Sequence, residues 1–130
     1  MIKFYKKYLG IDWGSKRIGL AIGDDETKIA TPFKVVKDMN EVLQVINNEN
    51  VQSIVLGKPY QISDSRFPIS EQFNDFLSLL RAKTKVRIDL IDERLSSKAA
   101  DALVGDKKTK ASRDTVAAML ILQNYLDKLP

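Results

Sequence analysis

The stretch Tyr8-Leu-Gly-Ile-Asp-Trp-Gly-Ser-Lys-Arg-Ile-Gly-Leu-Ala-Ile-Gly23 decides the fold of this chain. Residues 8–13 and 17–23 are short runs rich in isoleucine, leucine and aromatic residues, and Gly14-Ser-Lys16 joins them, which is typical of a β-hairpin. Glycine weakens a strand unless another backbone or a ligand comes close, and four glycines punctuate this hairpin. We therefore predict a crowded surface around Asp12.

A third strand and a first helix are predicted after the hairpin. Residues 29–36 form the strand, and Pro32 favours an irregular or edge position because proline cannot donate to a sheet ladder. From Asn40, the expected N-cap, apolar residues recur at helical spacing until the asparagine-rich cluster at 47–50. The wholly apolar run 53–57 then predicts a parallel strand that is covered on both faces and reached through a helical crossover.

The second half of the chain continues the alternation of helices and strands. Residues 58–68 form a predicted loop, and the apolar stripe of the next helix runs from Ile69 to Leu80. Residues 86–90 alternate between apolar and charged side chains, which predicts a half-exposed strand. Two more helices are expected: a short one capped by Ser96 or Ser97, running through Leu103 and stopped by Gly105, and a last one from near Ser112 to Leu126.

This order predicts an α/β fold in one domain, residues 1–130. An antiparallel meander followed by parallel crossovers gives a mixed five-stranded sheet flanked by helices. The length of 130 residues and the hydrophobic content of 44% fit one compact domain with a core.

Composition excludes several kinds of chemistry. Cysteine and histidine are both absent, so a disulfide, a thiolate nucleophile, a Cys/His zinc site and a histidine general base are impossible. Any catalysis must use carboxylates, hydroxyls, lysine, arginine and bound metal. No apolar run approaches the roughly 20 residues of a membrane span, and residues 1–7 lack the apolar stretch of a signal peptide. We expect a cytoplasmic protein that does not associate with a membrane.

Three acidic residues stand in apolar or small-residue settings: Asp12, Glu93 and Asp114. Strand ends and the start of the last helix can meet at one sheet edge, where carboxylates collect hard cations such as Mg²⁺ or Mn²⁺. Glu93 and its neighbour Asp92 would point to opposite faces of a strand, and we favour Glu93 as the ligand for its reach. Asp114 also has a structural explanation, because an acidic residue near a helix N-terminus is favoured by the helix dipole.

The net charge of +4 is compatible with binding to a polyanion. Basic residues gather in two zones, at the beginning of the chain and between Gly105 and Arg113, and both zones adjoin a candidate carboxylate. A solvated, lysine-rich loop explains the second zone equally well. The candidate nucleic-acid contacts are Lys16, Arg17, Arg94, Lys107, Lys108, Lys110 and Arg113, with Lys58, Tyr60 and Arg66 as weaker ones.

Four motifs occur in order: Gly10-Ile-Asp-Trp-Gly-Ser-Lys-Arg-Ile-Gly-Leu-Ala21, Val55-Leu-Gly-Lys-Pro59, Asp92-Glu-Arg-Leu-Ser-Ser97 and Asp114-Thr-Val-Ala-Ala118. With them the chain resembles the YqgF/RuvX family over nearly its whole length. That family has the RNase H-like fold and is regarded as Holliday-junction-resolvase-like nucleases, or as nucleases that mature the precursor of 16S ribosomal RNA. The resemblance implies that Asp12, Glu93 and Asp114 are catalytic. Lys58 departs from the Gly-Leu-Pro usual in the family.

We therefore expect a nuclease that uses Mg²⁺ or Mn²⁺ to hydrolyse phosphodiester bonds in structured RNA or branched DNA. Ribosomal precursor particles are a further expected partner, and the protein would act as a monomer or a homodimer. Two other functions fit the same residues. One is a non-catalytic RNA- or ribosome-binding factor, and the other is a nucleotide-binding phosphotransferase of the actin-like kind, which Gly10-Ile-Asp-Trp-Gly14 also resembles.

Overall fold

A computed structural model describes residues 5–58, 71–92 and 110–130 of the chain. Five strands form one mixed sheet in the order β3-β2-β1-β4-β5. The first three strands pair antiparallel, whereas β4 runs parallel to both β1 and β5. The strands are β1 (Lys7–Asp12), β2 (Ile18–Asp24), β3 (Ala30–Val36), β4 (Ser53–Lys58) and β5 (Arg87–Asp92). The predicted mixed five-stranded sheet is confirmed.

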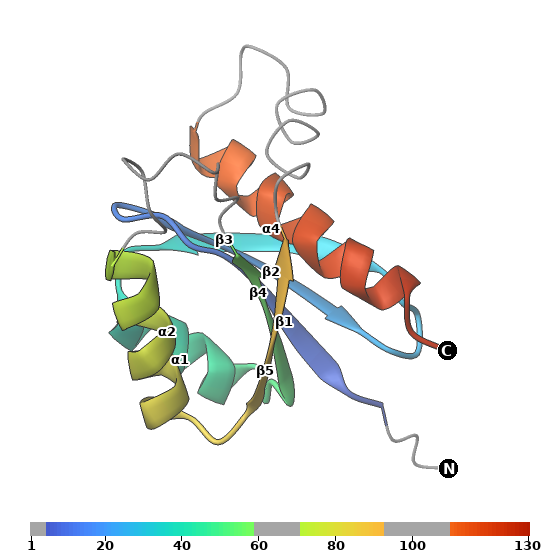
Figure 1. The fold of residues 1–130 in the computed structure, drawn as a ribbon. Coiled ribbons are helices and arrows are strands. Elements are labelled where there is room, and N and C mark those ends of the chain that lie inside the picture. The colour runs from blue at the N-terminus through green and yellow to red at the C-terminus, as the bar shows by residue number, and fades with distance from the viewer. Residues whose placement is uncertain (1–4, 59–70, 93–109) are drawn as a thin grey trace.

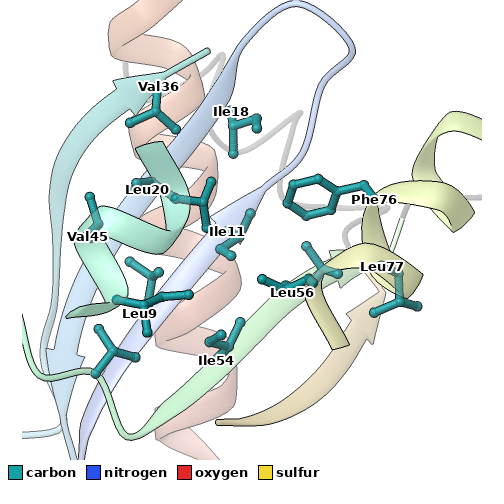
Figure 2. Close-up of a cluster of buried hydrophobic side chains, with 14 of the residues drawn as sticks. Leu9, Ile11, Ile18, Leu20, Val36, Val45, Ile54, Leu56, Phe76 and Leu77 are labelled. Atoms are coloured by element: carbon teal, nitrogen blue, oxygen red, sulfur yellow. The ribbon is translucent and has the colours of Figure 1, made fainter. Parts of the chain in front are cut away.

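Helices cover both faces of the sheet (Figure 1). On one face, α1 (Met39–Asn48) and α2 (Glu71–Lys83) enclose a core with Leu9, Ile11 and Leu56 (Figure 2). On the other face lies α4 (Lys110–Asp127), which packs on a second apolar cluster. None of the described helices combines the length and the apolar character that a membrane crossing requires.

Two predicted features of the first half are confirmed and one is wrong. Pro32 lies in β3, an edge strand, and the register between β2 and β3 shifts there. The run 53–57 forms β4, whose first five residues are all buried. The N-cap of α1 is Asp38 and not Asn40, because the Asp38 side chain accepts a hydrogen bond of 3.0 Å from the backbone N–H of Glu41. Asn40 lies inside the first turn.

The strand β5 departs from simple alternation. Leu90 is exposed, whereas Asp89 is half-buried. The cause is that β5 is an edge strand, and that Asp89 faces α4 and has a hydrogen-bond partner there. The predicted loop at 58–68, apart from Lys58 at the end of β4, and the predicted helix from Ser96 or Ser97 to Leu103 lie outside the described residues.

Contact between α4 and the sheet is close because glycines face the helix. A Cβ atom at Gly10 would lie 2.8 Å from the backbone oxygen of Ala118 and 2.8 Å from Cβ of Leu122. Gly10 pairs with Ala21 of β2, which belongs to the cluster under α4. The crowded surface predicted around Asp12 is therefore the interface with α4.

We predict that Gly10→Ala lowers the free energy of unfolding by about 1–3 kcal/mol, as overpacked cores do. The two crowded atoms belong to a backbone carbonyl and a Cβ, and neither can rotate away. Urea denaturation measures the change. Ser78→Ala, at an exposed site on α2, is the control and should stay within about 0.5 kcal/mol of the wild type. Wild-type stability in Gly10→Ala would contradict the close packing.

Candidate active site

Asp12 ends β1 and points toward α4. Its neighbours Ile11 and Trp13 face the other side: Ile11 lies in the core under α1 and α2, and the Trp13 ring packs edge-on against Phe73, with ring centroids 5.8 Å apart. Successive side chains of a strand point to opposite faces. Asp12 is therefore directed to the α4 face, as Gly10 is.

Gly19 brings Asp114 next to Asp12. Gly19 lies directly opposite Asp12 in the pairing of β1 with β2, and a side chain there would collide with the backbone carbonyl of Asp114. Cross-strand partners have Cα atoms about 5 Å apart, so Asp12 and Asp114 flank the same glycine. Two of the three predicted carboxylates thus come together at one corner of the sheet, although they are far apart in the sequence.

The position of Asp114 within α4 differs from the expectation. The helix begins at Lys110, two residues earlier than predicted, and its first turn contains no acidic residue. Asp114 therefore lies one turn inside, where the helix dipole stabilises an acid less. Ala118 and Leu122 follow at intervals of four and pack on Gly10, so Asp114 heads the stripe of α4 that faces the sheet. A carboxylate in that stripe needs a polar partner.

Arg17 is that partner. Its Nε donates a hydrogen bond of 2.8 Å to Oδ2 of Asp114. Arg17 comes from the turn between β1 and β2, and its side chain is 39% exposed, whereas the Asp114 side chain is only 13% exposed. A phosphate contact was the expected role of Arg17, and nothing in the sequence indicated this ion pair.

The third predicted carboxylate, Glu93, lies outside the described residues. Asp92, the alternative, ends β5 and shares its face with Ile88, which packs on the core under α1 and α2. Ile91 packs on the cluster under α4. Asp92 is therefore directed away from the face of Asp12. Within residues 5–58, 71–92 and 110–130, no group of three acidic residues is placed to hold a metal ion.

The predicted nucleic-acid contacts fall into two groups. Lys16 is exposed in the turn after β1, Arg113 is exposed on α4, and Lys58 is exposed at the end of β4. Lys110 begins α4. The others lie outside the described residues: Tyr60, Arg66, Arg94, Lys107 and Lys108.

Two hydrogen-bonded anchors fix α4 on the sheet and so position Asp114. The side-chain amide of Gln123 accepts from the backbone N–H of Ala30 at 2.9 Å and donates to the carbonyl of Lys28 at 2.8 Å, which ties the helix to β3. Tyr125 donates its hydroxyl to Oδ2 of Asp89 at 2.6 Å, which ties it to β5. Sequence reasoning missed both, although a carboxylate between Ile88 and Leu90 in a strand was a signal.

The hydrogen bond to Asp89 raises the pKa of Tyr125 to about 12, and partial burial adds to the effect. Burial raises the pKa of Tyr8 as well, and its ring lies 5.7 Å from that of Tyr125. Both tyrosines therefore stay protonated to higher pH in the folded chain than in an unfolded one.

A shallow cleft of about 730 Å³ lies at the other end of the sheet, lined in part by Tyr5, Lys7 and Glu49. It surrounds the start of β1, whereas Asp12 ends that strand. Lys7, which lines the cleft, lies five positions before Asp12 along β1, which corresponds to roughly 17 Å of extended strand. The cleft is therefore distinct from the carboxylate corner.

The sheet order, with helices on both faces, is that of the RNase H-like fold. RuvC of T. thermophilus, solved with a Holliday junction substrate, has a TM-score of 0.62 at 15% identity, over 92% of this chain and 93% of that chain. The fowlpox virus resolvase, solved with substrate Holliday junction DNA, has a TM-score of 0.58 at 12% identity, over 93% and 97%. At these identities the likeness concerns the fold alone.

The chain belongs to the RuvX family, described as Holliday junction resolvase, whose model matches residues 6–128. Two relatives carry the name "Putative pre-16S rRNA nuclease". The one from Maridesulfovibrio salexigens is 37% identical over 92% of this chain and 97% of that protein. The one from Endomicrobium trichonymphae is 32% identical over 93% and 95%. The family resemblance drawn from the sequence motifs is confirmed.

We predict that Tyr125→Phe loses stability only below about pH 12. The folded pKa lies above the unfolded value of about 10, so the stabilisation is complete below pH 10 and is lost as pH rises toward 12. Urea denaturation at pH 8 and pH 11 should show a larger difference between wild type and variant at pH 8. Tyr5→Phe, at an exposed site, is the control for removing a hydroxyl. An equal difference at both pH values would contradict the Tyr125–Asp89 hydrogen bond.

Proposed function

We propose that the protein is a metal-dependent nuclease in which Asp12, Glu93 and Asp114 hold one or two Mg²⁺ or Mn²⁺ ions. The observation that carries the proposal is the meeting of Asp12 and Asp114 over Gly19 in a chain of the RuvX family. The donor set fits the metal, because carboxylate oxygens are the ligands that hard divalent cations prefer.

Strand alternation supports Glu93 over Asp92 as the third ligand. Asp89 and Ile91 of β5 face α4, whereas Asp92 faces the opposite side. Because Asp92 faces away from Asp12, we take its sequence neighbour Glu93 as the third ligand. Because β1, β4 and β5 run parallel, their carboxyl ends also lie at the same end of the sheet.

The metal, when bound, activates a water molecule and stabilises charge on the leaving oxygen. The residues of the chain provide the geometry. Gly19 positions both backbones, because it pairs with Asp12 in the sheet and lies against the backbone of Asp114. Exposed Lys16 and Arg113 flank them and would hold the nucleic-acid backbone with little sequence preference.

The proposed substrate is the precursor of 16S ribosomal RNA, cleaved near its 5′ end, with the protein acting on ribosomal precursor particles in the cytoplasm. Relatives that share 37% and 32% identity over nearly the whole chain carry this name. The resolvases solved with Holliday junctions share only 15% and 12% identity, so branched DNA is the alternative substrate. Cleavage of a pre-16S RNA fragment and of a four-way DNA junction, measured side by side, distinguishes the two.

We expect Asp12→Asn to reduce Mg²⁺- or Mn²⁺-dependent cleavage at least about 100-fold, because the variant removes a ligand charge while the fold remains. Asp92→Asn is the matched control: it makes the same change on the opposite face and should retain cleavage. Glu93→Gln should behave as Asp12→Asn does. If Asp12→Asn cleaves as the wild type does, Asp12 is not a metal ligand. If Asp92→Asn loses cleavage, Asp92 rather than Glu93 is the third ligand. Binding by the wild type without cleavage of either substrate would instead favour a non-catalytic RNA-binding factor.

Each lysine that contacts a phosphate should make the binding of nucleic acid more dependent on salt concentration. Replacing Lys107, Lys108 and Lys110 together by glutamine should weaken binding across unrelated sequences. It should flatten the slope of log K against log salt by up to about 0.9 per lysine on duplex DNA and about 0.7 on single strands. The matched control replaces Lys83, Lys85 and Lys128, which are exposed at the other end of the sheet. Equal slopes in the two triple variants would show that the first three lysines are only solvated.

A further inference from the structure

The ion pair between Arg17 and Asp114 joins the two segments that carry the candidate ligands. Arg17 follows Asp12 in the turn that leads into β2, and it reaches across to Asp114 on α4. One of the two oxygens of Asp114, Oδ2, accepts the hydrogen bond from Nε at 2.8 Å. The carboxylate is largely buried while the guanidinium is more exposed, at 13% and 39%.

In this arrangement the guanidinium of Arg17 competes with any cation for the carboxylate of Asp114. The arginine side chain does not deprotonate in proteins, so its positive charge cannot be removed by a proton transfer. A divalent ion bound to Oδ2 would need the oxygen that Arg17 now contacts, and one bound to the other oxygen would face a fixed positive charge nearby. Arg17 can yield the position only by moving.

The side chain of Arg17 is partly exposed, so it can swing away from Asp114 into solvent. Its side chain starts in a turn, beside exposed Lys16, and not in the packed interior. Asp114 has less room, because its side chain is largely buried and its backbone lies against Gly19. A cation arriving at the corner would therefore displace the arginine and leave the carboxylate in place.

We propose that Arg17 and the metal ion exchange at Asp114, and that the displaced guanidinium then binds a phosphate of the nucleic acid. The proposal rests on the proposed function, because it assumes that Asp114 is a metal ligand. Arg17 then has two roles: it neutralises Asp114 until the ion arrives, and afterwards it binds the substrate, because its planar fork of donors suits a phosphate.

The exchange has a thermodynamic consequence. Arg17 weakens the binding of the ion to the protein alone, because the ion must break the ion pair. A phosphate that holds Arg17 away removes this competition, so nucleic acid and metal should each strengthen the binding of the other. If Arg17 served only to hold α4 in place, replacing it would have the opposite effect. Asp114 would then be held less firmly, and the protein would bind the ion more weakly.

The test measures Mn²⁺ binding to the full chain without nucleic acid, by calorimetry and by the rise in melting temperature that Mn²⁺ causes. Arg17→Gln should bind Mn²⁺ roughly 3- to 30-fold more tightly than the wild type, the range expected for release of a charge-assisted bond to a partly exposed partner. Arg17→Lys, which keeps the charge, should lie between the two. Circular dichroism in EDTA verifies that each variant is folded.

Lys37→Gln is the matched control for charge. Lys37 is exposed and follows Val36, which pairs with Ile18 beside Arg17, so this variant removes one positive charge from the same edge of the sheet. Tighter binding in Arg17→Gln alone, or binding seen only in that variant, supports the exchange. Equal or weaker binding in Arg17→Gln, or an equal gain in Lys37→Gln, overturns it while leaving the metal site intact. Absence of Mn²⁺ binding in every variant would overturn the metal-dependent nuclease as well.

Discussion

The approach of α4 to β1 and β2 is the constraint on which the rest of the structure depends. At Gly10 and Gly19 the sheet presents no side chain, so backbone meets helix directly. This contact decides where the helix can lie, and it places Asp114 beside the end of β1. A short aspartate side chain on a backbone that is fixed by packing has few positions available to its carboxylate, which is what a site of defined geometry requires.

The two faces of the sheet differ in the side chains that they carry. The face under α1 and α2 carries large side chains, including Leu9, Ile11 and Leu56, all of which are buried. The α4 face carries glycine, alanine and the candidate site. At the end of β1, Ile11 points to the core, Asp12 points to the candidate site, and Trp13, the next residue, points to the core again. The large core can therefore stabilise the fold without restricting which groups stand at the site.

Much of the fold followed from local patterns, whereas the partners of the site did not. Apolar periodicity and turn residues identify the strands and helices, since these depend on neighbours in the sequence. Asp12 and Asp114 stood out in the sequence as unusual acids at the ends of elements, and both adjoin Gly19 in the structure. Arg17 with Asp114, and Tyr125 with Asp89, depend on the register and depth of a helix docked across the sheet. Arg17 carries no local mark of its contact, whereas Asp89 stands between two apolar residues of a strand. The cap at Asp38, two residues before Asn40, did have a local signal, because Glu41 follows it at the third position as in a capping box.

The distance in sequence between α4 and the strands it covers has a kinetic consequence. The meander of β1, β2 and β3 is local, but α4 must close a loop of nearly the whole chain before it can dock. Until α4 docks, Tyr8, Ala21 and Val55 have no cover from the helix, and exposed apolar surface of this kind favours aggregation. Docking also brings Asp114 to the end of β1. A chain in which α4 has not docked therefore lacks the arrangement of Asp12 and Asp114 on which the proposed metal site depends.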